Sequence, residues 1–316
     1  MIPKIAVITG PTATGKTALG VALAKKTGGE IVSADSMQIY KQMNIGTAKP
    51  DAGEMAGVRH HMIDVVSPFE KYSVARFVRD ASSCVDDILG RGKLPIVTGG
   101  TGLYIDSLIS GREFAARGSD NTRRELAARY DSLGGEYMLN ELRKIDRESA
   151  ERLHFNDKKR IIRALEIYMT TGMTISEHDE MIRKMPPRYA ACKIALSYSD
   201  RADLYNHINL RVDAMMKKGL LNEVRELLDM GLTREHTAMQ AIGYKEIAGV
   251  ILDGEDLEDA VARVKMESRR YAKRQMSWLR RDKSARWIMW EKEPNFDNGL
   301  QISTKNLEEY GYNRAV

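Results

Sequence analysis

The chain has 316 residues, of which 43% are hydrophobic and 29% charged, as in a soluble globular protein large enough for about two domains. No apolar run approaches the roughly 20 residues of a membrane helix, and no signal-peptide pattern precedes the first strand, so we expect a cytoplasmic protein without a membrane segment. The net charge of +5 is compatible with many classes of partner, whereas the two cysteines, Cys84 and Cys192, exclude a disulfide framework and a cysteine-based zinc site.

The first part of the chain alternates between strand and helix patterns. Lys4–Thr9 is a β-branched apolar run typical of a buried parallel strand, and Lys16–Thr27 has apolar residues at helical spacing. This alternation predicts an α/β fold with a doubly wound parallel sheet, whose first part covers residues 1–113. The further predicted elements are a strand over Glu30–Ala34, a helix over Ser73–Arg91 and a strand over Lys93–Thr98.

The pattern becomes helical from about residue 114. We predict a helical insertion domain over 114–189, which includes a helix over Asp157–Thr171. A strand over Cys192–Tyr198 then returns to the sheet. The remaining predicted parts are a mainly helical second part of the core over 190–290, with a basic helix over Asp256–Arg281 and a short strand over Trp287–Trp290, and a polar, loosely held tail over 291–316.

The turn after the first strand matches the phosphate-binding loop G-x-x-x-x-G-K-[ST], and it lies between a strand and a helix as this motif must. Glycines let backbone N–H groups converge on an anion, and the helix N-terminus adds partial positive charge. We expect Lys16 to contact the terminal phosphates and the Thr17 hydroxyl to bind Mg²⁺, in a P-loop NTPase-like core; the alternative is a Gly-rich turn that arose by chance. The predicted loop consists of Gly10, Pro11, Thr12, Ala13, Thr14, Gly15, Lys16 and Thr17.

The phosphate-binding loop does not identify its ligand, because kinases, GTPases and transferases with a diphosphate leaving group can all use it. The N-K-x-D motif of a GTPase is absent. The strand that ends at Thr98 leads into Gly99–Gly102 without the magnesium-binding acid that most P-loop ATPases carry. The second strand instead leads into Asp35, which we expect at the carboxyl edge of the sheet, where α/β folds bind ligands.

A series of short runs resembles the tRNA dimethylallyltransferase family. After the phosphate-binding loop come D-S-M-Q-I-Y over Asp35–Tyr40 and G-T-A-K-P over Gly46–Pro50. The blocks span residues 10 to 281 in the order of that family, so the resemblance covers nearly the whole chain. The cysteines of the zinc finger found in some eukaryotic relatives are missing, which favours the bacterial type. The other blocks are Arg59–Asp64, Gly99–Tyr104, Asn156–Glu166, Gln240–Lys245 and Lys273–Arg280.

The resemblance implies a reaction. The dimethylallyl group of dimethylallyl diphosphate would pass to the exocyclic amine of the adenine 3′ to the anticodon in tRNA, with release of diphosphate and with Mg²⁺ as cofactor. Asp35 is then the candidate base for the amine proton, and Lys16 stabilises charge on the leaving diphosphate. Thr101 lies beside the reacting centre by resemblance, and Arg123 and Arg211 look like outer diphosphate contacts. The alternatives are a helix cap or a magnesium-organising acid for Asp35, and an N-cap for Thr101.

Resemblance and charge together imply an RNA-binding surface for the anticodon stem-loop. On the basic helix, Arg270, Arg274, Ser277 and Arg281 recur at helical spacing near Tyr271, which suits a surface that follows phosphates and stacks on bases. The alternative is an ordinary solvated face. By resemblance, Gln38 hydrogen-bonds the adenine. The implied tRNA-binding residues are Asp35, Ser36, Met37, Gln38, Thr101, Arg123, Lys159, Arg160, Arg163, Gln240, Gly243, Tyr244, Lys245, Lys273, Arg274, Gln275, Trp278 and Arg280.

Three other functions remain open from the sequence. A P-loop kinase would bind ATP and phosphorylate a nucleotide or small metabolite, and an adenylate isopentenyltransferase would prenylate a free nucleotide. A non-catalytic RNA-binding ATPase is the third. Because His60 and His61 are adjacent on a strand and point to opposite faces, we expect structural roles for them, not a shared metal. Nothing in the sequence requires a dimer, and we expect a monomer.

Overall fold

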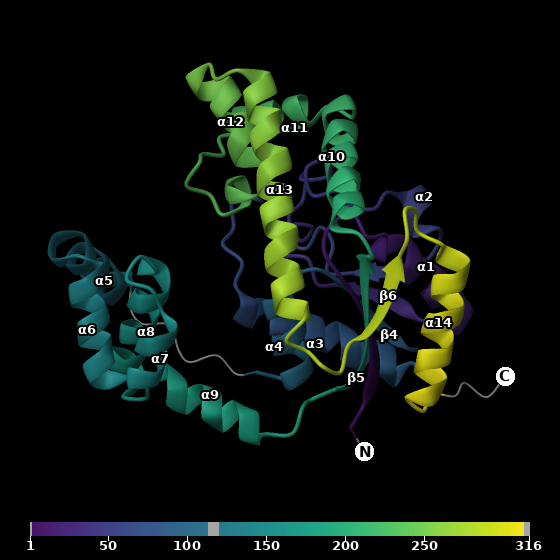
Figure 1. The fold of residues 1–316 in the computed structure, drawn as a ribbon, viewed down its shortest axis with the longest axis horizontal. Helices are drawn as coiled ribbons and strands as arrows, with labels where there is room; N and C mark the ends of the chain where they lie inside the picture. The colour runs from purple at the N-terminus through teal and green to yellow at the C-terminus, as the bar shows by residue number, and fades with distance from the viewer. Residues whose placement is uncertain (1, 113–119, 313–316) are drawn as a thin grey trace. The chain divides into compact units, whose positions relative to one another are not determined.

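The computed structural model describes residues 2–112 and 120–312, and the chain forms two compact units (Figure 1). The larger unit, which we call the core unit, comprises Met1–Gly111 and Arg188–Val316, and the insertion unit comprises Arg112–Pro187. The boundary predicted between residues 113 and 114 lies outside the described residues, as do residues 313–316 of the predicted tail.

The core unit is built on one six-stranded sheet in the order β3-β2-β4-β1-β5-β6. Every pair of neighbouring strands is parallel, with Val7 opposite Val97 on one side of β1 and Ile8 opposite Ile194 on the other. The α/β fold with a doubly wound parallel sheet is therefore confirmed. The strands are β1 (Lys4–Thr9), β2 (Glu30–Ser33), β3 (His60–His61), β4 (Pro95–Gly99), β5 (Ala190–Tyr198) and β6 (Arg286–Trp290).

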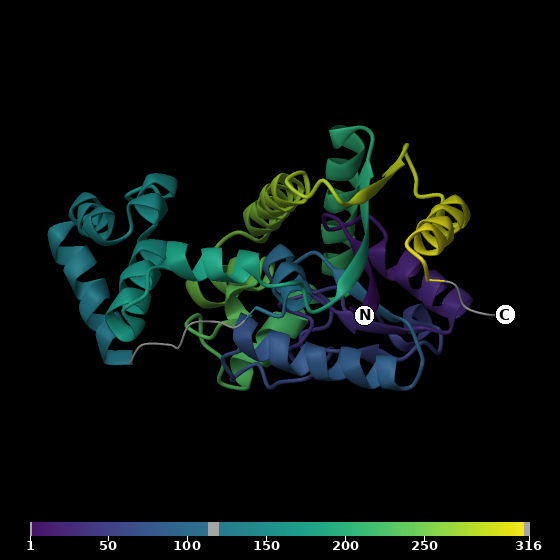
Figure 2. The same cartoon turned by 90° about the horizontal axis from the view of Figure 1, so that it is seen from below.

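Helices cover both faces of this sheet (Figures 1 and 2). α1 packs against β1, β2 and β4, α14 packs against β5, β6 and α1, and α3 packs against β2 and β4. α10 and α13 lie side by side in both views. The helices of the core unit are α1 (Lys16–Thr27), α2 (Ala52–Met55), α3 (Val74–Gly90), α4 (Gly102–Ser110), α10 (Arg201–Lys217), α11 (Leu220–Asp229), α12 (Tyr244–Asp253), α13 (Leu257–Leu279) and α14 (Phe296–Glu309), with a 3₁₀ turn over Ala238–Gln240.

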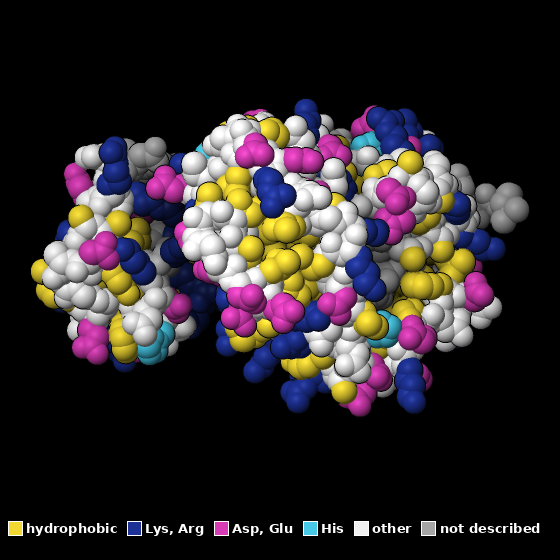
Figure 3. All heavy atoms as spheres, turned by 90° about the horizontal axis from the view of Figure 1, so that it is seen from above, with side chains coloured by type: hydrophobic (Ala, Val, Ile, Leu, Met, Phe, Trp, Pro, Cys, Tyr) yellow, Lys and Arg dark blue, Asp and Glu magenta, His cyan; other side chains and the backbone are white. Residues whose placement is uncertain are grey.

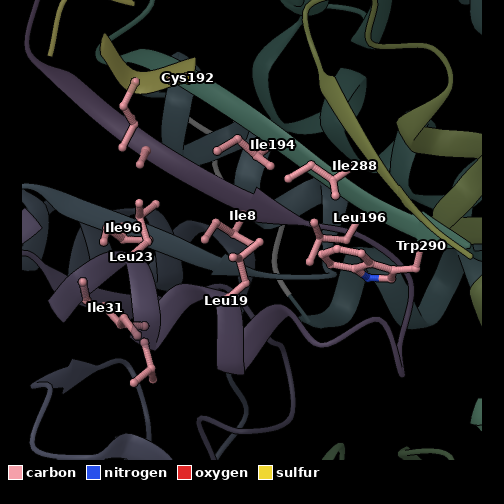
Figure 4. Packing of buried hydrophobic residues seen from close by; sticks show 14 of the residues in the cluster. Ile8, Leu19, Leu23, Ile31, Ile96, Cys192, Ile194, Leu196, Ile288 and Trp290 are labelled. Carbon is pink, nitrogen blue, oxygen red and sulfur yellow. The ribbon is translucent and has the colours of Figure 1, made fainter. Parts of the chain in front are cut away.

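The largest part of the core follows from strand periodicity. Successive side chains of a strand point to opposite faces, so every second residue faces the same helices. Figure 4 shows Ile8, Ile194, Leu196 and Trp290 pointing to the face that Leu19 of α1 also lines. The alternate residues, such as Ile5, Val7 and Val97, are buried as well, so both faces of the sheet are covered and its strands are continuous apolar runs.

The C-terminal segment corrects one expectation. The tail over 291–316 was expected to be loosely held, but Phe296–Glu309 forms α14, which packs on α1 and on the sheet. Its buried positions are Gly299, Ser303 and Leu307, spaced like one face of a helix. Leu307 is 3% exposed and belongs to the main apolar cluster. The expectation is wrong for this helix, because two of the three buried positions hold the small residues Gly and Ser, which hide its buried face from a hydrophobicity pattern.

The insertion unit is helical throughout its described residues. Met138, Leu142 and Ile161 are fully buried in an apolar cluster of their own, so this unit has a core independent of the sheet. Its helices are α5 (Asp120–Leu133), α6 (Gly135–Ile145), α7 (Arg147–Arg152), α8 (Lys158–Thr171) and α9 (Ile175–Lys184).

None of the helices in the described part of the chain combines the length and the apolar character that a membrane span requires.

Candidate active site

The sheet brings the predicted chemical groups of the core unit to one edge. The phosphate-binding loop follows β1, Asp35 follows β2 and Thr101 follows β4, and all three strands run in the same direction. In a parallel sheet the carboxyl ends of the strands share one edge, which is where α/β folds bind ligands. Residues that are up to 91 positions apart in the sequence, Gly10 and Thr101, therefore come to the same edge of the sheet.

The phosphate-binding loop is held by side chains from the C-terminal half of the chain. Gly15 has φ 78°, a left-handed conformation, and a Cβ there would lie 2.6 Å from the ring of Phe296. The indole Nε1 of Trp290 donates to Thr14 O at 3.0 Å, and the Tyr198 hydroxyl donates to Ala13 O at 3.2 Å. Side chains of β5, β6 and α14 thus contact the loop and help to fix its conformation.

Lys16 and Arg211 place two cations at this loop. The Lys16 ammonium donates to Pro11 O at 2.6 Å, and burial together with the charge of Arg211 lowers the pKa of Lys16 to about 7, although Asp35 acts in the opposite direction. Burial likewise lowers the pKa of Arg211, which α10 carries. Two partly desolvated cations that repel each other form a site that an anion would stabilise. Lys16 and Arg211, both predicted to bind diphosphate, are thus near enough for the charge of one to act on the other.

Asp35 closes the turn that follows β2. Its Oδ1 accepts hydrogen bonds from the backbone N–H of Met37 at 2.8 Å and of Gln38 at 3.3 Å. Asp35 therefore caps the backbone of this turn, as its alternative role predicted. The cap uses only Oδ1, and Oδ2 has no hydrogen-bond partner among the described residues. The charge of Asp35 also acts on Lys16 and on Arg211. The charge of this carboxylate therefore acts on both cations, and one of its oxygens has no hydrogen-bond partner among the described residues.

Thr101 connects the loops that follow β2 and β4. It precedes α4, yet its side chain forms no hydrogen bond that caps this helix. The Thr101 hydroxyl oxygen instead accepts from the backbone N–H of Ser36 at 3.2 Å, and the Thr101 N–H donates to Ala34 O at 3.3 Å. The N-cap alternative is wrong for this side chain, which lies beside the Asp35 turn.

Tyr271 of α13 is a site residue that the sequence did not place here, because its position on a basic helix suggested a stacking role on RNA. Burial, and next the charge of Asp35, raise the pKa of Tyr271 to about 12, while the Thr101 hydroxyl and the charge of Arg274 act in the opposite direction. The phenol is therefore neutral at physiological pH and close to both Asp35 and Thr101. Its position four residues before Gln275 and seven before Trp278 marks the inner face of α13.

This inner face carries two of the predicted tRNA contacts, Gln275 and Trp278. Gln275 is 6% exposed; its Oε1 accepts from Thr12 N at 3.1 Å and its Nε2 donates to Gly100 O at 2.9 Å. The Trp278 indole covers Gly102, where a Cβ would collide with the ring, and donates to Asp106 Oδ2 at 2.9 Å. Both side chains join α13 to the sheet-edge loops, so we no longer assign Gln275 to an exposed RNA-binding face, and the ring of Trp278 is only partly accessible.

The outer face of α13 remains exposed. The basic side chains of Arg270, Lys273, Arg274 and Arg280 are all exposed, and the hydroxyl-bearing Ser277 lies among them. Arg270 pairs with Glu267 on the same helix at 2.6 Å, and the Arg274 guanidinium lies 5.5 Å from the centre of the Tyr271 ring. One helix thus contributes to the site on its inner face and presents positive charge on its outer face.

The Gln240–Lys245 segment divides in the same way. Gln240 and Lys245 are exposed, whereas Gly243 and Tyr244 are buried. The Tyr244 hydroxyl donates to Glu223 Oε1 at 2.5 Å, so this side chain also belongs to the interior and not to a surface.

Comparison with known proteins assigns the family. A family model described as IPP transferase matches residues 38–282, and one described as Isopentenyl transferase matches residues 3–67. The chain belongs to the IPP transferase family.

Relatives of this IPP transferase are similar over nearly their full length. The tRNA dimethylallyltransferase of Acetivibrio thermocellus is 48% identical over 308 residues, which cover 97% of each chain, and that of Carboxydothermus hydrogenoformans is 46% identical with 100% of each chain covered. The crystal structure of the full-length tRNA isopentenylpyrophosphate transferase from Bacillus halodurans matches with a TM-score of 0.73 and 40% identity over 98% of each chain. A eukaryotic dimethylallyltransferase acting on tRNA matches with a TM-score of 0.81 and 30% identity, over 99% of this chain and 81% of the other. The resemblance inferred from the motifs is confirmed.

The insertion unit of this IPP transferase carries the other predicted contacts. Lys159 and Arg160 on α8 are exposed, and Arg160 lies 3.5 Å from Asp157. Arg163 donates to Glu166 at 3.0 Å, and Arg123 of α5 lies 4.0 Å from the same buried carboxylate. Within this unit Arg123 is thus a partner of Glu166, and its assignment to the diphosphate stays a prediction.

The roles of His60 and His61 and the predicted magnesium site can be compared with the side-chain contacts present. His61 Nε2 lies 2.8 Å from Glu30 Oε2 and His60 Nδ1 lies 2.9 Å from Val58 O, so each ring has its own structural partner. The described residues contain no group of three His, Cys, Asp or Glu side chains that could hold a metal. Mg²⁺ needs few protein ligands when a substrate supplies phosphate oxygens. The Thr17 hydroxyl in the first turn of α1, without a hydrogen-bond partner among the described residues, fits that requirement.

Proposed function

We propose that the phosphate-binding loop holds the diphosphate of dimethylallyl diphosphate, and that Asp35 accepts the proton from the exocyclic amine of the adenine 3′ to the anticodon. As a member of its family, the enzyme transfers a dimethylallyl group to tRNA. We further propose that a single chain acts on the anticodon stem-loop in the cytoplasm. The observation that carries the proposal is that Asp35 follows β2 at the sheet edge that the phosphate-binding loop shares, where its charge acts on Lys16 of the loop and on Arg211 of α10.

The reaction breaks one bond and forms another. The amine nitrogen forms a bond to the first carbon of the dimethylallyl group, and the electron pair of the breaking carbon–oxygen bond leaves with the diphosphate. The amine loses one proton, which Asp35 takes up. Because the exocyclic amine of adenine is conjugated with the ring and is a weak nucleophile, removal of this proton in the transition state contributes to the rate.

The cations act on the leaving group. Lys16, Arg211 and the loop amides stabilise the negative charge that develops on the departing diphosphate, in a site that already excludes part of the solvent. Mg²⁺ bound at Thr17 would neutralise part of the same charge. The Tyr271 phenol, whose pKa is raised to about 12, stays protonated and can hydrogen-bond near the reacting centre without competing as a base.

Label transfer tests this function against its rivals. Incubation with Mg²⁺ and dimethylallyl diphosphate labelled in the prenyl group should label unmodified tRNA and leave AMP unlabelled. Label in AMP would favour an adenylate isopentenyltransferase. If neither acceptor is labelled while ATP supports phosphorylation of a small molecule, the chain is a kinase and the proposed function is wrong.

The outer face of α13 is the proposed surface for the RNA backbone. On the face of the molecule in Figure 3, basic side chains are interspersed with acidic and apolar ones, so the net charge alone does not locate an RNA site. The exposed row on α13 is a more specific candidate because Arg270 and Arg274 lie one turn apart on one helix, which ends at Leu279, before Arg281. Such a surface binds phosphates by releasing counterions, which makes the affinity depend on salt.

Replacing Arg270 and Arg274 by Ala should weaken tRNA binding and reduce the slope of log Kd against log salt by about 1 to 2, since each lost phosphate contact removes roughly 0.7 to 0.9 from the slope. Filter binding at several salt concentrations measures this. The matched control is Lys25→Ala with Lys26→Ala, two exposed lysines in the last turn of α1, at the opposite end of that helix from the loop. An equal change of slope in both double variants would remove α13 from the interface.

A further inference from the structure

A buried carboxylate holds the loop that contains the G-T-A-K-P run. Glu223, on α11, is 8% exposed. Its Oε2 accepts from the backbone N–H of Asn44 at 2.9 Å and of Ile45 at 2.8 Å, and its Oε1 accepts from that of Gly46 at 3.1 Å. Three consecutive backbone donors on one carboxylate form an anion-binding concavity that is filled by a side chain of the protein itself.

Tyr244 completes this arrangement. Its hydroxyl donates to Glu223 Oε1 at 2.5 Å, and burial and the Glu223 charge raise the pKa of the phenol. Gly46 lies against the Tyr244 ring so closely that a Cβ at this position would collide with it, and Leu220 of α11 would be 2.9 Å away. The two helices α11 and α12 therefore fix the backbone of residues 44–46 through one acid, one phenol and one close contact.

The fixed backbone continues into the partners of Gln38. Gln38 Nε2 lies 3.2 Å from Ala48 O and 3.4 Å from Thr47 O, and Gln38 Oε1 accepts from the Ser33 hydroxyl at 3.2 Å. The carbonyl groups that orient the Gln38 amide thus belong to the residues directly after the three that Glu223 holds. Gln38 itself lies in the Asp35 turn, whose N–H groups bond to Asp35.

The other end of the same loop is held by the side chain of Lys49. The Lys49 ammonium, on a side chain that is 4% exposed, donates to Tyr40 O at 2.8 Å and to Asn44 Oδ1 at 2.9 Å, and pairs with Asp64 at 2.5 Å. Side-chain hydrogen bonds therefore hold the loop at both ends, so we expect a displacement of residues 44–46 to move Ala48 as well. The orientation of the Gln38 amide follows from it.

We propose that Glu223 is a positioning residue for the acceptor base: together with Tyr244 it fixes the loop over 44–49, and through Ala48 it orients the Gln38 amide for the adenine. This inference rests on the proposed function, in which Gln38 contacts the acceptor. The proposed role of Glu223 concerns binding of the acceptor adenine and not binding of the diphosphate. The side chains that hold the phosphate-binding loop are Gln275, Trp290 and Tyr198, and none of their hydrogen bonds to it involves residues 44–49.

The test compares the two substrates in Glu223→Gln. A carboxamide keeps the size of the side chain, but its NH₂ group would face backbone donors, so the loop must shift. We expect kcat/KM for tRNA to fall about tenfold or more, as the loss of one well-oriented hydrogen bond implies. The Kd for inorganic pyrophosphate, measured by calorimetry without tRNA, should stay within about twofold of wild type. The matched control is Glu226→Gln on the same helix, an exposed acid with the same change of charge.

A double-mutant cycle with Gln38→Ala separates positioning from general destabilisation. If Glu223 acts through Gln38, the Glu223→Gln change should cost less than about twofold in kcat/KM for tRNA once Gln38 is Ala. Fully additive losses, or equal losses for tRNA and pyrophosphate, would overturn the positioning role. If Glu223→Gln fails to fold, Tyr244→Phe, which keeps the three backbone bonds, should show the same selective loss at smaller size, and an effect on pyrophosphate instead would overturn the role.

The cycle also distinguishes this inference from the function on which it rests. The wild-type enzyme should transfer the label to tRNA, and Gln38→Ala alone should lower kcat/KM for tRNA. Transfer without any effect of Gln38→Ala would overturn the positioning role and leave the reaction itself standing, whereas absence of label transfer in the wild type would overturn both.

Discussion

Asp35→Asn is expected to lower the rate of prenyl transfer by about 10²–10⁴-fold, the usual contribution of a general base. Asn keeps a carbonyl oxygen at the position of Oδ1, which accepts from Met37 N and Gln38 N, so the turn after β2 stays closed. The substitution removes the proton acceptor and its charge, and little else. Single-turnover transfer from labelled dimethylallyl diphosphate measures the rate, and filter binding should show tRNA affinity close to that of the wild type.

Two precautions make the Asp35 result specific. Asp35 raises the pKa of Lys16, so its loss favours the neutral amine, and the comparison belongs near pH 6, where Lys16 stays protonated. Asp51→Asn is the matched control, because Asp51 also accepts a backbone N–H, that of Glu54 at 2.8 Å, as the cap of α2. A turnover of Asp35→Asn within about threefold of wild type would exclude the base role.

Local patterns were sufficient to predict the sheet and the phosphate-binding loop. β1 and α1 have the predicted bounds, Lys4–Thr9 and Lys16–Thr27. A continuous apolar run defines the strand, and the Gly-rich motif requires a strand before it and a helix after it, which fixes where both elements end and begin. The doubly wound sheet follows from the alternation of strands and helices and from the handedness of the crossover. Each of these features is encoded within about 30 residues of sequence.

The features that the sequence did not predict depend on tertiary contacts. Gln275 is polar and lies among arginines and lysines, so its type and position both suggested the surface. Its burial becomes understandable only when Gly100 and the Thr12 amide are known to face it. Glu223 is a similar case: an acid on an amphipathic helix normally faces solvent, and here it is buried because three backbone donors 177 to 179 residues away need an acceptor.

The core unit also shows why a basic helix gave a partly wrong assignment. A helix has an inner and an outer face, and on α13 both carry polar or aromatic residues. Tyr271, Gln275 and Trp278 reach the loops at the sheet edge, while Arg270 and Arg274 face outward. Charge density alone cannot separate these faces. The inner face is identified by its contacts with two glycines: Gln275 lies against Gly100 and Trp278 against Gly102. A side chain at either glycine would prevent the contact.

Pyrophosphate binding to the free enzyme should take up protons at Lys16. The pKa of Lys16 is lowered to about 7 by burial and by Arg211, so the amine is largely neutral above pH 7. A bound diphosphate stabilises the ammonium and raises this pKa, so binding above pH 7 requires a proton from solvent. Well below pH 7 the ammonium is already present, and Lys16 adds no pH dependence. The contribution of Lys16 to affinity should therefore fall, by at most about tenfold per pH unit, as the pH rises from 7 toward the pKa of the complex.

Lys16→Arg isolates this effect, because a guanidinium stays charged throughout the range. Pyrophosphate itself titrates, but equally with both enzymes, so the ratio of the wild-type to the variant Kd reports on Lys16. Calorimetry without Mg²⁺ at pH 8, in two buffers of different ionisation enthalpy, should show more proton uptake for the wild type than for Lys16→Arg. Lys16→Ala should lower kcat about 10²–10³-fold, since it removes one donor to the leaving group. Equal proton uptake by wild type and Lys16→Arg would mean that Lys16 is already an ammonium in the free site, held by Asp35 against the repulsion of Arg211.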